Sequence, residues 1–557
     1  MLLPDPNSCS STKFIPAGWQ PHFCRDCGLD ETARPCEGRL RRGHSVRARE
    51  FWVKLRRLLL LAAGLLSSAA IAGPFADAGD RQLRQDVDLL RAAGIIRGPV
   101  DSWPLPWRQI DGGLDAARDG RALDLYLAAA VARLERLSDL AAQRTSVDAR
   151  IDVASGTALR RDFGAVTRAN VDAAVRVELN LGALSVDAGV GARTARSGQR
   201  YNFEPSQVAV TIGNVAIYGG YTPEWFGPGH DGALLYSTSA RPFPKIGIKK
   251  LLPSAFDVPV LRWFGPFRFD FFVGILDGKR DFRNSANIGT RVSFEPAKGV
   301  EIGLNRAQQL CGAGRPCGFH QISHSFLGIG YGDPGPTTPA NYVRQPGNQL
   351  AGFDISYARR FGRIAGKIYF EGEAENFRHA ILEQFGRQIG TTWSGPWGHR
   401  GASWQASVEY ADTLASAFFG GATYPGSLYN NSLYLDGFTY KGRPIGYWTD
   451  GDSRNLVASL SVTDARNRRW YGSVNAVHLN LTGISGVATG PYGLYRGTVG
   501  NRVSPDSEKF AIGAAGVEWP TRFGDLRLET RYQTDTPGTP GRRAPRVQVE
   551  AGLRQRF

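Results

Sequence analysis

The sequence predicts an all-β transmembrane barrel of about 18 antiparallel strands, preceded by a small N-terminal α-helical periplasmic domain. Three observations carry this prediction: long stretches in which apolar residues alternate with polar ones, an amphipathic final strand that ends on an aromatic residue, and an export signal ahead of the first helix. Strands of about ten alternating residues, joined by short turns at one end and longer polar loops at the other, are typical of bacterial outer-membrane barrels.

The alternation is clearest in VDAAVRVELNLGALSVDAGVGAR. Its apolar residues occupy odd positions from 171 to 181 and then even positions from 184 to 190, so one tight turn at Gly182-Ala183 joins two antiparallel strands. FRFDFFVGIL repeats the pattern from Phe267 to Ile275. We also expect residues 151–159 to continue a strand, and QVAVTIGNVAIYGG, residues 207–220, to form a single one.

The last segment, RVQVEAGLRQRF, alternates through Val547, Val549, Ala551 and Leu553 and ends on Phe557. A terminal aromatic on such a strand is the signal that the barrel assembly machinery recognises, so we expect that machinery as a partner. The barrel is predicted to span residues 147–557, and at about 23 residues per strand and loop this length gives about 18 strands. A soluble sandwich or propeller would need two-sided apolar strands or a blade repeat, and neither is present.

Residues 73–146 are predicted to form the periplasmic helical domain, with helices between residues 80 and 143. RQLRQDVDLLRAAG places Leu83, Val87 and Leu90 on one face and stops at Gly94, a natural C-cap. A short helix is expected from about Ile110 to Ala117. A longer one follows, because apolar residues recur at helical spacing from 123 to 137.

An export signal precedes this domain. VKLRRLLLLAAGLLSSAAIAGPF has a basic start, an apolar centre and small residues at its end, so residues 53–72 are predicted to be a signal peptide. We expect residues 1–52 to be a non-native upstream extension, with the native start at Val53 or Leu55. Cys24-x-x-Cys27 lies in this extension without a second pair, so we expect no zinc site there. The predicted location is the bacterial outer membrane.

The remaining cysteines and the charge fit an exported protein. Cys311 and Cys317, in CGAGRPC, are expected to form a disulfide that closes a loop tip. The net charge is +16, of which residues 1–72 contribute +5, leaving +11 for the rest. Such a surface favours polyanions such as acidic glycans or lipopolysaccharide, although 57 Arg against 10 Lys equally suits a GC-rich genome. We expect outer-membrane lipid and lipopolysaccharide as partners, and no nucleic acid.

Several stretches together resemble the Wzi family of capsule-assembly outer-membrane proteins. In chain order they are LRQDVDLLRAAGIIRGPVDSWPL, PEWFGPGHDGALL followed by RPF, RWFGPFRFDF, PGNQLAGFDISY, GHRGASWQASVEYADT and YLDGFTYKGRPIGYWTDGDSRNLV. The resemblance implies an 18-stranded barrel with a periplasmic helical bundle. It also implies a surface lectin that holds exported capsular polysaccharide or exopolysaccharide against the cell.

The stretch YTPEWFGPGHDGALLY, residues 221–236, has two readings. Its prolines restrict the backbone to a rigid conformation. Its aromatic rings can fold inward to plug the barrel or stack on sugar rings, and the two readings are compatible. The loops TTWSGPWGHRG and YLDGFTYKGRPIGYWTDGD offer similar aromatic and charged sets, although aromatic girdles compete as an explanation. The candidate polysaccharide-binding residues are Glu224, Trp225, Phe226, His230, Asp231, Arg241, Trp393, Trp397, His399, Tyr440, Arg443 and Trp448.

We expect no enzyme, metal or cofactor. Glu224 and Asp231 could form a glycosidase pair only if the loop held them at a suitable distance, which its sequence permits but does not require. The histidines 320, 324, 379 and 399 form no fixed metal-binding spacing. The predicted function is a lectin-like outer-membrane protein that binds and anchors capsular polysaccharide or exopolysaccharide. The alternatives are a porin or polysaccharide export channel, and a structural barrel whose helical domain docks a periplasmic partner.

Overall fold

The computed structural model describes residues 73–118, 123–164, 166–194, 200–320, 322–323, 347–375, 384–418, 421–431, 433–489, 496–538 and 545–557. The expected upstream extension (1–52), the expected signal peptide (53–72), His324 and His379 lie outside these residues. From Ala62 onward the chain forms one compact unit, and all that follows concerns this unit.

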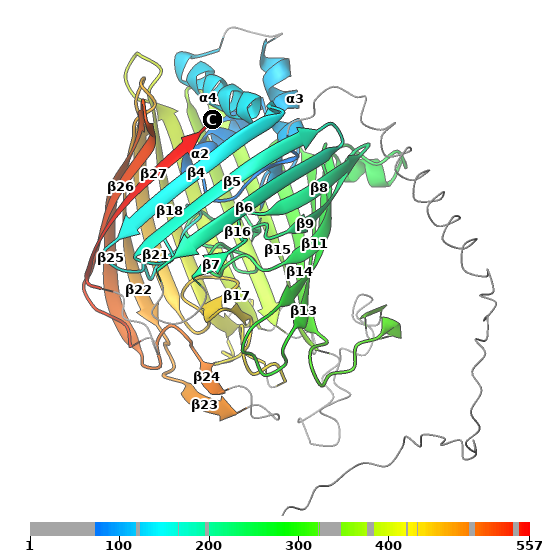
Figure 1. Ribbon diagram of the computed structural model, residues 1–557, viewed down its shortest axis with the longest axis vertical. Coiled ribbons are helices and arrows are strands. Elements are labelled where there is room, and N and C mark those ends of the chain that lie inside the picture. The colour runs from blue at the N-terminus through cyan, green and yellow to red at the C-terminus, as the bar shows by residue number, and fades with distance from the viewer. Residues whose placement is uncertain are drawn as a thin grey trace, which may run out of the picture. The chain divides into compact units, whose positions relative to one another are not determined.

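Three helices occupy the positions that the sequence predicts: α2 (Arg81–Ala92), α3 (Trp107–Arg118) and α4 (Leu125–Ala142). The carboxylate of Asp80 caps α2 by accepting a 2.9 Å hydrogen bond from the Leu83 backbone N–H. Gly94, with φ of +75°, follows the end of this helix. The helices lie at one end of the barrel, beside the C-terminus (Figure 1). None of the helices described here is both long and apolar enough to cross a bilayer.

The described strands close into an antiparallel barrel of 18 strand positions, as predicted. Short β7 and the longer β8 share one position, because both pair with β6. The barrel strands are β4 (Thr145–Ala154), β5 (Val171–Leu181), β6 (Leu184–Arg193), β7 (Tyr201–Asn202), β8 (Gln207–Ile212), β9 (Val215–Gly220), β11 (Lys245–Lys250), β12 (Phe267–Leu276), β13 (Ser285–Ala297), β14 (Val300–Leu310), β15 (Asn348–Phe361), β16 (Ile364–Glu375), β17 (Phe385–Pro396), β18 (Ser403–Ser416), β21 (Arg454–Thr463), β22 (Arg469–Leu479), β25 (Glu508–Thr521), β26 (Gly524–Gln533) and β27 (Val547–Arg556).

Small two-stranded sheets accompany the barrel. They pair β1 (Phe75–Ala76) with β3 (Leu105–Pro106), β2 (Ser102–Trp103) with β10 (Trp225–Phe226), β19 (Thr439–Tyr440) with β20 (Arg443–Pro444), and β23 (Ser485–Thr489) with β24 (Arg496–Gly500). The pairing of β2 with β10 joins the helical region to a segment more than a hundred residues away in the chain.

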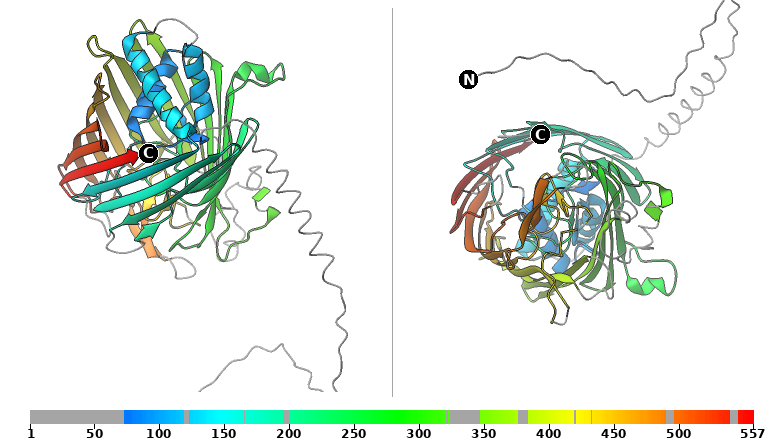
Figure 2. Two further views of the ribbon diagram at one scale, coloured as in Figure 1. Left: turned by 45° about the horizontal axis from the view of Figure 1, so that its top comes forward. Right: turned by 90° about the horizontal axis from the view of Figure 1, so that it is seen from below.

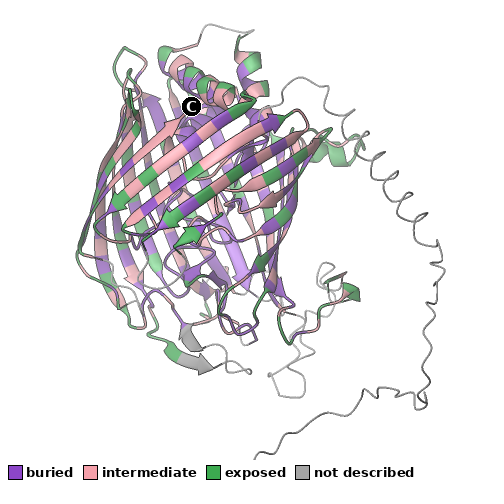
Figure 3. Cartoon of the chain, in the orientation of Figure 1, coloured by how far each residue is buried: buried purple, intermediate pink, exposed green. Residues whose placement is uncertain are grey.

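The barrel closes where the last strand meets the first, with Glu550 opposite Ala154. Burial alternates along many of the strands (Figure 3), as expected when successive side chains point to opposite faces of the wall. In β12, Arg268 and Asp270 are buried inside the barrel, whereas Phe271 and Ile275 lie on the outer face. A closed barrel with an apolar outer face satisfies every backbone group without water, so the protein is an outer-membrane barrel.

Two strand predictions were wrong in detail. Residues 207–220 form a hairpin, β8 and β9, around a turn at Gly213-Asn214, where Gly213 has φ of +58°. The apolar residues change there from even to odd positions, the same signal that marks the turn at 182–183. Strand β4 ends at Ala154, and the residues after it turn into the lumen, where Arg160 pairs with Asp231.

The two ends of the barrel differ. Near the helices the strands are joined by short turns, for example at 182–183, 298–299 and 362–363, with the longer 251–266 as an exception. At the opposite end the connections are longer, among them 221–244 and 417–453. Outer-membrane barrels place short turns in the periplasm and long loops outside. We therefore call these the helix end and the loop end.

Candidate functional site: the filled lumen and the loop end of the barrel

The connection 221–244 leaves β9 at the loop end and turns back into the lumen. Trp225 pairs with Trp103 between β10 and β2, and both side chains are buried. The ring of Phe163 packs edge-on against both, with centroid distances of 5.1 Å to Trp225 and 5.3 Å to Trp103. The guanidinium of Arg84, from α2, lies 4.4 Å from the centre of the Phe163 ring. Of the two readings of this stretch, the structure matches the plug.

A second aromatic cluster ties the same connection to the barrel wall. Tyr236 packs edge-on against Phe226, at 5.1 Å, and against Phe272 of β12, at 5.2 Å. Its ring also meets Phe438, at 5.7 Å, from the connection between β18 and β21. The Tyr236 hydroxyl donates a 2.6 Å hydrogen bond to Asn287 of β13. Two loop-end connections and the wall therefore share one apolar core.

Asp231 is the polar centre of the plug. Its carboxylate accepts hydrogen bonds from the Trp448 indole at 2.9 Å, the Asn455 amide at 2.7 Å and the Tyr447 hydroxyl at 3.1 Å, and it pairs with Arg160. Burial, and then the charge of Asp231, raises the pKa of Tyr447 well above its usual value, so this hydroxyl remains a donor. Trp448 and Asp231 are thus bonded to each other inside the protein.

Carboxylates of the wall hold the backbone of the plug. Glu409 of β18 accepts from the backbone N–H groups of His230, at 2.8 Å, and Asp231, at 3.0 Å. Glu371 of β16 accepts from the backbone N–H of Leu234 at 2.7 Å. These hydrogen bonds satisfy backbone donors that would otherwise be buried without partners.

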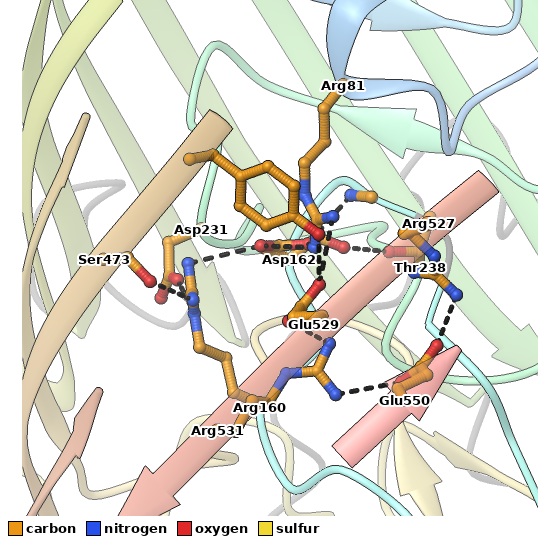
Figure 4. Close-up of polar contacts among 12 residues, drawn as sticks. Arg81, Arg160, Asp162, Asp231, Thr238, Ser473, Arg527, Glu529, Arg531 and Glu550 are labelled. Atoms are coloured by element: carbon orange, nitrogen blue, oxygen red, sulfur yellow. Dashed lines mark hydrogen bonds and ion pairs between the residues drawn. The ribbon is translucent and has the colours of Figure 1, made fainter. Parts of the chain in front are cut away.

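Ion pairs extend from the plug to α2 and the wall (Figure 4). Asp162 lies 3.3 Å from the guanidinium of Arg160 and 2.8 Å from that of Arg81, which comes from α2. Arg81 also approaches Glu529 of β26 at 3.5 Å. Burial alone would raise the pKa of Asp162, but the charges of Arg81 and Arg160 hold it well below its usual range. This network of ion pairs connects α2, two connections inside the lumen and the barrel wall.

Glu224 belongs to a separate network. It accepts a 2.9 Å hydrogen bond from the Tyr218 hydroxyl and one of 3.0 Å from Lys249. Both Glu224 and Asp231 are buried. Each carboxylate is therefore bonded to its own protein partners.

The hairpin of β19 and β20 covers the plug at the loop end. Arg443 donates to the backbone carbonyl oxygens of Leu159, at 2.7 Å, and Ala158, at 2.8 Å. The Tyr440 hydroxyl donates to the carboxylate of Asp277. Tyr440 and Arg443 are both buried, so these two candidate residues support the cover from within.

Partly exposed side chains gather around this hairpin. Lys441 pairs with Asp277 at 3.0 Å, and Arg241 pairs with Glu204. Burial, and then Asp277, raises the pKa of Tyr440, and the charges of Arg241 and Glu204 act on the same hydroxyl, so all of these groups lie together. We call the set the loop-end patch. Burial, and then the charges of Asp277 and Glu204, also raise the pKa of Tyr221, so this residue belongs to the same set. The members of the patch are Glu204, Tyr221, Arg241, Asp277 and Lys441.

A cavity follows the inner face of β4, β5 and β6. It has a volume of about 290 Å³ and is lined by charged side chains that include Arg150, Arg176, Asp172 and Glu178. Pockets that hold a single drug-sized ligand usually measure about 300–1,000 Å³. This cavity is therefore at the lower limit of the size that holds one small ligand.

Comparison with known proteins decides the family. The family model described as capsule assembly protein Wzi matches residues 141–470, which is more than half of the chain. The chain belongs to the Wzi family. The resemblance carried by its sequence motifs is thereby confirmed, and so is the family's barrel architecture.

Two relatives illustrate the relationship. The solved structure of Escherichia coli Wzi, described as an outer membrane protein involved in group 1 capsule assembly and a carbohydrate-binding β-barrel, superposes with a TM-score of 0.69. The identity is 20%, over 86% of this chain and 99% of that one. An uncharacterized 55.8 kDa protein in the cps region of Klebsiella pneumoniae is 27% identical over 312 residues. That alignment covers 55% of this chain and 59% of the Klebsiella protein.

Three candidate residues of this Wzi-family barrel lie away from the plug. Trp393 is on the outer face of β17, and Trp397 and His399 lie in the turn that joins β17 to β18 at the helix end. Gly401 of the same turn packs against the first turn of α4. Trp397 is 58% exposed and Trp393 39%. This placement favours an aromatic girdle over a sugar-binding loop.

Two further features stand at the loop end. Cys311 and Cys317 form a disulfide in the structure, with their sulfur atoms 2.05 Å apart. His320, close by in the chain, is exposed. Within the part of the chain that the structure describes, no group of three His, Cys, Asp or Glu side chains is placed to hold a metal ion.

Sequence reasoning missed three residues that hold the plug of this Wzi-family protein, one from the connection after β4 and two from strands of the wall. Arg160, Glu371 and Glu409 were not among the candidates, although each bonds directly to the 221–244 connection. A signal was present in YFEGEAE, where carboxylates occupy alternate positions of a strand. Charges that alternate with outward apolar residues point into a lumen, and such buried carboxylates need partners.

Proposed function

We propose that this protein binds capsular polysaccharide or exopolysaccharide at the loop end of a closed barrel and helps to hold it at the cell surface. The observation that carries the proposal is the filled lumen. Trp103, Trp225 and Trp448 are at most 1% exposed and pack between loop-end connections, helix α2 and the wall. A barrel filled in this way is suited to present a surface and poorly suited to pass a polymer.

Family membership supports the same function. The E. coli relative is described as a carbohydrate-binding barrel involved in capsule assembly. The alternative function, a porin or export channel, would require a continuous polar passage. The plug, with Trp225 and Asp231 buried inside the barrel, lies where such a passage would run.

The loop-end patch is the candidate contact surface. Tyr221 offers a ring face for stacking on a sugar, and Arg241 and Lys441 offer cationic donors for carboxylates and hydroxyls. Each of these contacts is weak, but a polymer that meets many barrels on one cell gains avidity by multivalency. The buried candidates, Trp225 and Trp448 among them, would then shape the patch without touching the glycan.

Two further partners belong to the proposal. The outer face of the barrel contacts outer-membrane lipid, and its basic loop-end side chains suit lipopolysaccharide. The assembly machinery would recognise β27, whose terminal Phe557 is 61% exposed and bonds through its backbone to Val147.

The experiment is equilibrium binding of the barrel, reconstituted in vesicles, to the surface polysaccharide of the producing strain. Arg241→Ala and Lys441→Ala are each expected to weaken binding about 3- to 10-fold, and added salt to weaken it further. Arg466→Ala is the matched control, because Arg466 is an exposed arginine in a turn at the helix end. Equal loss in the control, or no loss in either test variant, would contradict the assignment of the patch.

A further inference from the structure

The connection 251–266 departs from the other turns at the helix end. It joins β11 to β12 and contains a turn of 3₁₀-helix, η2 (Leu261–Phe264). The views in Figures 1 and 2 agree that this green segment projects from the barrel wall away from the lumen. The motif RWFGPF, residues 262–267, runs from this connection into the first residue of β12, and neither the plug nor the loop-end patch uses this motif.

The connection is fastened to the outside of the barrel. Its first residues bond to the neighbouring turn, with the Leu252 backbone N–H donating to the Asn214 side chain at 2.6 Å. The ring of Phe256 stacks on Phe267 with centroids 3.9 Å apart, and the ring of Phe264 lies 5.3 Å from Phe294. Phe267 and Phe294 are partners in the pairing of β12 with β13.

These contacts place the connection on the lipid-facing side of the wall. Phe267 and Phe294 have the same parity as the outward residues of their strands, because Arg268 and Ser293 beside them are buried inside. The outward face of β12 continues toward the loop end through Phe269, Phe271, Val273 and Ile275. The connection is therefore continuous with the apolar belt that contacts the membrane.

Around these contacts the connection presents apolar side chains that the described part of the protein leaves largely exposed. The exposed fractions are 83% for Trp263, 69% for Val260, 54% for Val258 and 46% for Phe264, and no residue of η2 is buried. Exposed apolar clusters of this kind mark interaction surfaces. Trp is enriched at membrane–water interfaces, where its apolar body meets acyl chains and its N–H meets headgroups.

We propose that residues 258–264 insert into the periplasmic leaflet of the outer membrane, with Trp263 at the boundary between headgroups and acyl chains. The occupant of this surface is lipid, because the surface begins on the lipid-facing belt at the membrane edge of the barrel. Arg262, between Leu261 and Trp263, can reach phospholipid phosphates while its neighbours enter the acyl region. The connection acts as a lateral anchor that fixes the depth and tilt of the barrel.

The test is depth-dependent fluorescence quenching of the full-length protein in phosphatidylethanolamine–phosphatidylglycerol vesicles. One vesicle set carries lipids brominated close to the headgroup, and a second carries lipids brominated close to the terminal methyl. The chain contains 12 Trp residues, so the signal of Trp263 is read as the difference between wild type and Trp263→Phe. Trp393→Phe, on the outer face of a strand, provides a membrane-exposed reference.

The proposal predicts that Trp263→Phe removes a blue-shifted emission component that shallow bromine quenches more than deep bromine and that aqueous iodide does not reach. A component quenched by iodide and untouched by brominated lipid would overturn the proposal, because Trp263 would then lie in water. Protection from both quenchers would also overturn it, and would indicate a protein partner or a second copy on this surface. Val260→Asp provides an independent test. The proposal predicts that this variant, once folded, partitions less into vesicles than wild type. Unchanged partition would contradict the proposal.

Discussion

The indole N–H of Trp448 donates a 2.9 Å hydrogen bond to the carboxylate of Asp231, although 217 residues separate them in the chain. This bond joins two connections at the loop end inside the barrel. Arg160 pairs with the same carboxylate. The plug that fills the lumen is therefore held together by one buried carboxylate with several partners. The stability of the plug therefore depends on Asp231 more than on any single aromatic residue.

Asp231→Ala tests that dependence. The substitution removes one of the two carboxylates that pair with the buried Arg160, and breaking a buried pair in this way costs about 3–5 kcal/mol. Urea unfolding of the barrel in vesicles should show a loss of this order, together with new steady conductance in a planar bilayer. Asp525→Ala, at an exposed turn, should stay within about 0.5 kcal/mol of wild type. Equal stability of the two variants would contradict the role of Asp231.

Glu409→Ala tests the hold of the wall on the plug. The backbone N–H groups of His230 and Asp231 would lose their acceptor, at a cost of about 1–3 kcal/mol for each donor left unsatisfied. Hydrogen exchange of residues 228–236 should become faster. Glu409→Gln keeps one acceptor oxygen and should show a smaller effect. If protection in this segment were the same in both variants as in wild type, the proposed clamp would not exist.

Acid should loosen the loop end. Burial would raise the pKa of Glu204, but its hydrogen bond to Arg193 and the charges of Arg193, Arg168 and Arg241 lower the pKa from 4.5 to about 2. A lowered pKa in the folded state gives stability that is complete above the unfolded value of 4.5 and is lost as pH falls toward 2.

The measurement is the free energy of unfolding between pH 5 and pH 2, compared with that of Glu204→Gln. The wild-type value should fall across this range more steeply than the value of the variant. Parallel curves would show that protonation of Glu204 does not contribute to the pH dependence of stability.

The helix-end aromatic residues should be irrelevant to glycan binding. Trp397→Ala and Trp393→Ala are expected to leave polysaccharide affinity within about twofold of wild type, because these side chains lie at the end remote from the loop-end patch. Binding isotherms with the same polysaccharide decide the matter. A large loss in either variant would place the glycan at the helix end instead.

The alternation of apolar and polar residues predicted well where the strands lie. It was less successful at showing where one apolar stretch is divided into two strands by a turn. FRFDFFVGIL corresponds to β12 residue for residue, because alternation on a membrane-spanning strand is imposed by lipid on one face and polar lumen on the other. The hairpin of β8 and β9 was missed, although its parity change at Gly213 carried the information. A shift of the apolar residues from even to odd positions is therefore as strong a turn signal as a single Gly or Asn.

The course of the loops could not be predicted in the same way. Nothing local to GPGHDG states that Asp231 meets Arg160, Trp448 and Asn455, which come from three other parts of the chain. The loop around Trp448 has the aromatic and charged residues that are typical of a sugar-binding site. Trp448 is nevertheless buried, and its indole N–H donates to the carboxylate of Asp231. Long-range pairing decides whether a loop aromatic residue serves the core or a ligand, and one sequence does not contain that pairing.

The most direct test of the central claim is electrical recording of the wild-type barrel inserted in one orientation in a planar bilayer, with purified surface polysaccharide added to each side in turn. The account predicts no steady conductance, and saturable polysaccharide binding, read from labelled polymer on the same membrane, only from the side that carries the long loops. A large stable conductance that polysaccharide blocks from either side would contradict it, because the protein would then be a channel through which the glycan passes.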